Sequence, residues 1–263
     1  MQNNLDQKQW ATQKQLKANF RDIQAEQTTS SSSKSWVEQV SGNSYEEFKR
    51  PEVHVYLAGP DVFYPDAIQI GDNNKKLLVQ LGMIGHFPFD NIIDPEIFKN
   101  PKLAAQTIAE NNEKIMKDIC SEGRVGVILA NMNPWHGPST DVGTSFEIGF
   151  MSALSHFKNV IIIGYSEDTR KFEDRVTQDH YKGNVTTDEK GRVWGSDGKE
   201  VEKFGCADNL MLTSAIERTG GKICKTFEEA AILAKELSDN LIKQLEEKRE
   251  QTVARQNKQW AMS

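Results

Sequence analysis

The sequence predicts an α/β fold built on a parallel sheet, because short apolar runs alternate with helical patterns from residue 53 onward. Residues 53–58, 125–130 and 160–164 are almost continuously apolar, which is typical of strands buried on both faces. Helical segments separate these runs, and that alternation indicates parallel strands joined by right-handed crossovers. We therefore expect a flavodoxin- or Rossmann-like sheet flanked by helices, with a small β-hairpin excursion and an N-terminal extension.

The first half of this region begins with the strand at 53–58, which ends at Gly59-Pro60. A helix over 73–81 and a second strand over 83–87 follow. Pro101 suits the first turn of a helix through 119, since the first helical residue needs no amide hydrogen. The strand at 125–130 leads into a polar loop over 131–140.

The second half of the region continues the alternation. A helix is predicted over 143–154, with Phe146, Phe150 and Ala153 at core spacing. After the strand at 160–164, turn signals within 166–203 indicate the hairpin excursion. A short strand at Ile223-Cys224 then precedes a last helix.

The last helix opens at Thr226 and Glu229, which have the form of a capping box. One apolar face is expected on this helix, made of Phe227, Ala230, Leu233, Ala234, Leu237 and Leu241. From Glu246 onward the sequence is charged, and we expect this tail to fray.

Composition and charge exclude several classes of protein. The chain has 263 residues, and 32 Lys and Arg against 38 Asp and Glu give a formal net charge of −6. This acidic balance argues against a general nucleic-acid binder, which carries a basic face. Apolar runs fall short of the roughly 18 residues that cross a membrane, and the first residues lack the apolar region of a secretion signal. We expect a cytoplasmic protein with no nucleic-acid or membrane partner.

Three regions are predicted along the chain. Residues 1–50 form an N-terminal extension, either helical or flexible, in which sparse apolar residues precede a serine run. Residues 51–246 form the main domain, and residues 247–263 form a charged C-terminal tail. A mobile extension with no function of its own is an equal alternative for 1–50.

Neither a metal nor a cofactor is expected. No pair of histidines has ligand spacing, and neither the dinucleotide fingerprint nor the phosphate-binding loop occurs. The cysteines are Cys120, Cys206 and Cys224, which we interpret as reduced, structural thiols.

The candidate site lies at the carboxyl ends of the strands, where open parallel sheets bind ligands. Glu147 sits between Phe146 and Ile148 in a predicted helix, so its carboxylate needs hydrogen-bond partners. Tyr56 and Asp141 can lie at the same cleft, and two carboxylates there suit glycosyl chemistry. The structural alternative is that Asp141 only caps the helix and Glu147 lies in solvent.

Five segments together resemble the nucleoside 2-deoxyribosyltransferase family. They are VYLAGPDVFYPD at 55–66, ENNEKIMKDI at 110–119, VGVILANMNPWHGPSTD at 125–141, GTSFEIGF at 143–150 and VEKFGCADNLML at 201–212. The resemblance implies that a 2-deoxyribosyl group passes between nucleobases. Glu147 would attack C1′ of a 2′-deoxynucleoside and form a glycosyl ester, and a second base would displace it with overall retention.

The resemblance also assigns roles to other residues, each with a structural alternative such as core packing or helix capping. It implies that Tyr56 orients the nucleophile and that Asp141, in protonated form, lies near the leaving base. It implies substrate binding by Asn112, Phe63, Gly59, Asp61, Asn209 and Met211, with Asp208 and Trp135 as candidates at the lip. Asn209 and Met211 are expected to complete the site of a neighbouring subunit, so the protein would be a homo-oligomer. The loop over 132–140 is interpreted as a lid.

Two other functions stay open. Water in place of the acceptor base would make the protein a hydrolase of 2′-deoxynucleosides or their 5′-monophosphates, and Thr144 and Ser145 at a helix N-terminus suit a phosphate. A non-catalytic nucleotide-binding module is the second alternative. The sequence does not distinguish purine from pyrimidine substrates.

Overall fold

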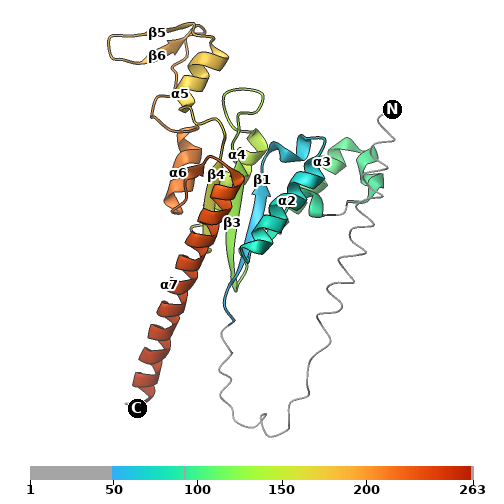
Figure 1. Cartoon of the computed structure of the whole chain (residues 1–263), viewed down its shortest axis with the longest axis vertical. Coiled ribbons are helices and arrows are strands. Elements are labelled where there is room, and N and C mark those ends of the chain that lie inside the picture. Colours follow the sequence, from blue (N-terminus) through green and yellow to red (C-terminus); the bar gives the residue numbers. More distant parts are fainter. Residues whose placement is uncertain (1–48, 92, 262–263) are drawn as a thin grey trace. The chain divides into compact units, whose positions relative to one another are not determined.

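The structure is a computed structural model that describes residues 49–91 and 93–261, so the helix predicted within 1–50 lies outside the described residues. Five parallel strands form the central sheet in the order β2-β1-β3-β4-β7 (Figure 1). They are β1 (Glu52–Ala58), β2 (Ile84–His86), β3 (Arg124–Asn131), β4 (Val160–Tyr165) and β7 (Ile223–Cys224). This is the strand order of flavodoxin-like sheets, which confirms the predicted fold class.

Helices cover both faces of the sheet (Figure 1). Alternate residues of β1 face opposite sides, so Val55 packs with helices α2 (Ala67–Gln80) and α7 (Phe227–Ala261). Tyr56 packs with the opposite layer. That layer consists of α3 (Pro101–Asp118), α4 (Val142–Leu154) and α6 (Leu210–Arg218).

Helix α2 begins at Ala67 rather than near Asn73, and the reason is a packing contact. Gly71 disfavours a helix in isolation, which explains why the sequence pattern places the start too late. A Cβ at Gly71 would lie 2.7 Å from the ring of Phe87, so glycine lets the helix approach the chain after β2. Helix α3 begins as predicted at Pro101, and its cap Asn100 accepts a hydrogen bond from the Leu103 amide.

The predicted core face of α4 is wrong. Phe146 is 57 % exposed, Ala153 is exposed and Phe150 is only partly buried. The residues that face the sheet are instead Thr144, Ile148, Met151 and Ser152. Because α4 carries apolar residues on more than one face, their spacing alone does not identify the inner one.

The excursion after β4 contains the predicted hairpin, in which β5 (Val185–Thr187) pairs antiparallel with β6 (Val193–Gly195). Helix α5 (Phe172–Arg175) and a π-helical turn (Val176–His180) precede it, and the group stands apart from the sheet in Figure 1. Three short 3-10 turns lie among the described residues. They are η2 (Pro60–Phe63) after β1, η3 (Pro88–Asp90) after β2 and η4 (Pro95–Lys99) before α3.

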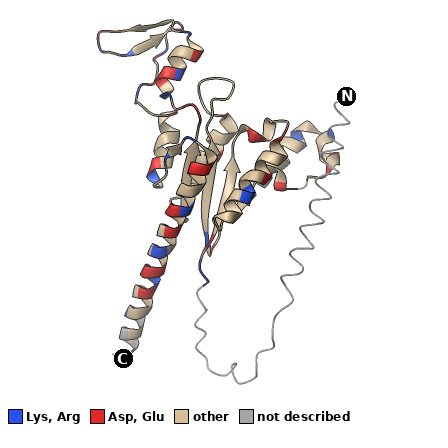
Figure 2. Ribbon diagram, in the orientation of Figure 1, with Lys and Arg blue, Asp and Glu red and all other residues tan. Residues whose placement is uncertain are grey.

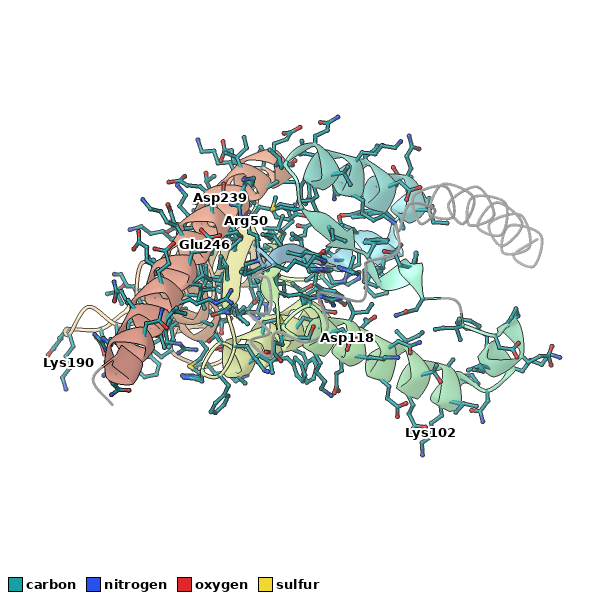
Figure 3. The ribbon with its side chains drawn as sticks, turned by 90° about the horizontal axis from the view of Figure 1, so that it is seen from below. Arg50, Lys102, Asp118, Lys190, Asp239 and Glu246 are labelled. Carbon is teal, nitrogen blue, oxygen red and sulfur yellow. The ribbon has the colours of Figure 1, made fainter. Side chains whose placement is uncertain are left out.

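Helix α7 has two different halves. Its first half packs on the sheet through the predicted apolar face, and Arg50 before β1 pairs with Asp239 on α7 at 3.2 Å (Figure 3). Its second half extends past the sheet and carries charges of both signs (Figure 2). The helix continues to Ala261, so the predicted fraying from Glu246 is wrong. Across residues 49–261, none of the helices combines the length and apolar character of a bilayer span.

Candidate active site

Tyr56 and Glu147 meet at the carboxyl edge of the sheet. Tyr56 points from β1 toward α4 and is fully buried, while Glu147 lies in the second turn of α4. The Tyr56 hydroxyl donates a hydrogen bond of 2.6 Å to Oε1 of Glu147. The two helices that follow β1 and β3 cover opposite faces of the sheet, so this pair lies at the point where such sheets open a ligand crevice.

Burial controls the protonation of this pair. Desolvation raises the pKa of Glu147 to about 7, the Tyr56 hydrogen bond acts against that rise, and the negative charge of Asp141 adds to it. Burial also raises the pKa of Tyr56 well above its ordinary value, so the phenol stays a donor. Glu147 is therefore a poorly solvated carboxylate that titrates near neutral pH, which suits a nucleophile.

Asp141 is the N-cap of α4. Its Oδ2 accepts hydrogen bonds from the Thr144 amide at 2.9 Å and the Thr144 hydroxyl at 3.2 Å. The capping alternative therefore holds for Asp141, whereas Glu147 is half-buried and hydrogen bonded rather than free in solvent. The expected protonated form of Asp141 near the leaving base stays a prediction.

Asp61 lies in a second network at the same edge. Its Oδ1 accepts from the side-chain Nδ2 of Asn131 at 2.9 Å, and its Oδ2 accepts from the Tyr165 hydroxyl at 3.4 Å. Burial raises the pKa of Asp61. Gly59 has φ of +152°, and a Cβ there would lie 2.6 Å from Cβ of Asn131. Gly59 and Asp61 thus hold η2 against the ends of β3 and β4.

Aromatic side chains join η2 to the loop between β3 and α4. Phe63 is 65 % exposed and stacks on Trp135 with ring centroids 5.7 Å apart. Tyr64 meets the same indole edge-on at 5.9 Å. Asn112 lies partly buried on α3.

Asn209 and Met211 lie at the start of α6. Asn209 caps this helix through its side chain, whose Oδ1 accepts from the Met211 backbone amide at 3.1 Å and whose Nδ2 donates to Glu202 at 2.7 Å. The capping alternative therefore applies to Asn209 within its own chain. The Met211 side chain is 70 % exposed. Their expected role in a neighbouring subunit stays a prediction.

Several residues of the site region were missed from the sequence. Asn131 and Tyr165 are polar residues at the ends of buried strands, a signal that would have found them. Arg175 lies in a polar segment without any such signal, yet it is fully buried. Among residues 49–91 and 93–261, no three His, Cys, Asp or Glu side chains gather as a metal site would require.

Comparison with known proteins decides the family. The sequence model described as "Nucleoside 2-deoxyribosyltransferase" matches residues 55–211. This chain belongs to the nucleoside 2-deoxyribosyltransferase family. The matched stretch begins within β1 and ends in the first turn of α6, so it contains Tyr56, Asp141, Glu147 and Asn209.

This family member is also similar to individual proteins and solved structures. An uncharacterised Schizosaccharomyces pombe protein is 29% identical over 181 residues, which are 66% of this chain and 81% of that protein. A 2-desoxiribosyltransferase from Leishmania mexicana has 26% identity and a TM-score of 0.49, covering 71% of this chain and 98% of its own. A conserved protein from Enterococcus faecalis V583 has 17% identity and a TM-score of 0.41, covering 72% and 99%.

Proposed function

We propose that this chain transfers a 2-deoxyribosyl group between nucleobases through a covalent intermediate on Glu147. The observation that carries the proposal is the short hydrogen bond between Tyr56 and Glu147 at the carboxyl edge of the sheet, in a chain that belongs to this family. A neutral tyrosine holds Oε1, while Oε2 of Glu147 accepts no hydrogen bond from the described residues. Oε2 is then the atom available to attack.

The reaction has two displacements at C1′ of a 2′-deoxynucleoside. In the first, Oε2 of Glu147 forms a bond to C1′ while the bond from C1′ to the base nitrogen breaks, and the base leaves with the electron pair and takes up a proton from water. In the second, a nitrogen of the acceptor base attacks C1′, the acceptor gives up its N–H proton to water, and the ester bond breaks with its electron pair returning to Oε2, which restores the carboxylate. Two inversions retain the configuration at C1′.

The surrounding residues suit this chemistry. Oδ2 of Asp141 accepts the two hydrogen bonds from Thr144 that cap α4. We therefore propose that its other oxygen, Oδ1, faces the leaving base. Phe63 and Asn112 are proposed to contact the base. Gly59 and Asp61 hold the turn that bounds the crevice.

A homo-oligomer is part of the proposal. Val142 and Phe146 on α4 and Met211 on α6 are large apolar side chains with exposures of 84 %, 57 % and 70 %. Helices α4 and α6 pack side by side, and contiguous exposed apolar surface marks interaction sites. A second copy of this chain is the proposed partner, with Asn209 and Met211 reaching its site.

Incubation of the full chain with thymidine and adenine tests the reaction. We expect deoxyadenosine together with free thymine, and a deoxyribosyl adduct on the peptide that contains Glu147 in a quenched mixture without acceptor. Free deoxyribose without deoxyadenosine would show a hydrolase instead. An adduct on any other residue would contradict the assignment of Glu147.

A further inference from the structure

An ion pair between Arg175 and Asp208 lies beside the candidate site and takes no part in the chemistry described above. Nη2 of Arg175 donates to Oδ2 of Asp208 at 2.9 Å. Each side chain is only 1% exposed. Buried charges are rare and costly unless they are paired and hydrogen bonded, so what each member contacts shows what the pair holds together.

Asp208 uses its full acceptor capacity. Oδ1 accepts from the Ser139 hydroxyl at 2.9 Å and from the Asn209 amide at 2.7 Å. Oδ2 accepts from the Thr140 amide at 3.2 Å as well as from Arg175. A carboxylate has about four acceptor positions, so Asp208 is saturated by the loop before α4 and by the start of α6.

Arg175 binds the same two segments through backbone carbonyls. Its Nε donates to Pro138 at 2.7 Å, in the loop before α4. Its Nη2 donates to Ala207 at 2.7 Å, before α6, and its Nη1 donates to Arg170 at 2.9 Å, in the excursion. The planar guanidinium can contact all three because its donors point in fixed, divergent directions.

We propose that Arg175 and Asp208 are positioning residues for the transfer reaction, which hold the start of α4 in place relative to the start of α6. Thr140, which is bound by Asp208, is followed directly by Asp141, the cap of the helix that carries Glu147. Asn209, also bound by Asp208, caps α6. This inference rests on the proposed function, since it assigns the pair a part in that reaction.

The hydrogen bonds of the Arg175–Asp208 pair, which we call the tie, also change the interpretation of the loop over 132–140. Its beginning is held by Asn133, whose Oδ1 accepts from the Glu167 amide at 2.9 Å. Its end is held by the contacts of Pro138, Ser139 and Thr140 to the ion pair. Hydrogen bonds thus hold the loop at both ends. We infer a fixed wall in place of the predicted lid.

Two variants of the pair and one control test the positioning role. Asp208→Asn keeps the size of the side chain but loses its charge, and Arg175→Lys offers a point charge that cannot reach three carbonyls. Lys199→Gln is the matched control, because Lys199 lies in the same excursion but pairs at the surface with Asp197 and does not contact the ion pair. Circular dichroism measures the folded fraction, so that rates refer to folded protein.

We expect each pair variant to lower kcat per folded molecule by about 10- to 100-fold, the loss that follows a small misplacement of reacting groups. The control should stay within about twofold of the wild type, since exposed pairs contribute little. The acidic limb of the pH–rate profile should also move to higher pH, because a loosened α4 weakens the Tyr56 hydrogen bond that holds down the pKa of Glu147. A change in global stability alone would not move that limb.

Amide hydrogen exchange provides a readout that needs no substrate. If the pair is a tie, exchange at Thr140 and Asn209 accelerates in both variants and not in the control. Faster exchange with an unchanged kcat and an unmoved acidic limb overturns the positioning role. A wild-type chain without transfer or hydrolysis overturns the proposed function, and the exchange data then still report whether the tie exists. Asp208→Asn, the milder change, serves if Arg175→Lys does not fold.

Discussion

Two carboxylates lie near the carboxyl edge of the sheet in opposite circumstances. Glu147 on α4 accepts one hydrogen bond, from a neutral tyrosine, and burial raises its pKa to about 7. Asp208 before α6 accepts hydrogen bonds from four groups, one of them a buried arginine. The first carboxylate therefore has one hydrogen-bond donor, whereas the second is surrounded by donors on both of its oxygens.

This difference separates reactivity from positioning. A carboxylate with few partners keeps an oxygen available for a bond to substrate, and its poor solvation favours that bond. A saturated carboxylate has no free oxygen, but it fixes every segment that donates to it. The same residue type thus suits two tasks, and the number of donors around it indicates which one.

The largest expected effect is on activity at Glu147. We expect Glu147→Gln to lower the rate of deoxyadenosine formation from thymidine and adenine by more than about 10³-fold, since the amide cannot form the ester. The exposed Glu247→Gln is the control and should keep the wild-type rate. A Glu147→Gln variant that still transfers at a tenth of the normal rate would remove Glu147 as nucleophile.

The next effect concerns stability at the saturated carboxylate. Arg175→Met leaves Asp208 buried without its cation, and we expect a loss of about 3–5 kcal/mol in the free energy of unfolding. Urea denaturation followed by circular dichroism measures this loss. Lys199→Met removes a surface cation from the same excursion and should shift the midpoint much less. Equal shifts in the two variants would erase the distinction between the two carboxylates.

At Glu147 we expect the charged carboxylate itself to lower the free energy of unfolding, so that stability depends on pH. Its folded-state pKa of about 7 lies above the ordinary value of 4.5, so the folded state binds the proton more tightly than the unfolded chain does. The stabilisation is complete below about pH 4.5 and is lost as the pH rises through 7, a change of about 3 kcal/mol. We expect Glu147→Gln to unfold at higher urea concentration than wild type at pH 8, and the gap to close near pH 4.5. A constant gap across this range would mean that Glu147 is not desolvated.

The smallest effect is expected at Tyr56. Tyr56→Phe keeps the ring packed but removes the hydrogen bond that lowers the pKa of Glu147. Since the nucleophile must be charged, the acidic limb of kcat/KM should move to higher pH, with about a tenfold lower rate at pH 7. The pH–rate profile of the two proteins measures both changes. An unmoved limb would show that Tyr56 does not control the charge of Glu147.

Local patterns predicted most of the secondary structure and part of the site. The apolar runs at β1, β3 and β4 were recognisable because strands buried on both faces need apolar residues at every position. The apolar neighbours of Glu147 left a partnered and a solvent-exposed carboxylate both open, and the family resemblance of residues 143–150 identified it as the candidate nucleophile. The inner face of α4 was not recognisable, since Phe146 and Ile148 are equally apolar and only packing against the sheet separates them.

The sequence by itself determined the succession of strands and helices along the chain and the place of an acid between apolar neighbours, because these depend on residues close together in the chain. Tertiary structure decided what holds that acid and its surroundings. Tyr56 and Glu147 are 91 positions apart, and Arg175 and Asp208 are 33 apart. Contacts between residues so far apart in the chain produce no helical or strand periodicity in the sequence. These residues meet because the crossovers of the parallel sheet bring the ends of its strands to one edge.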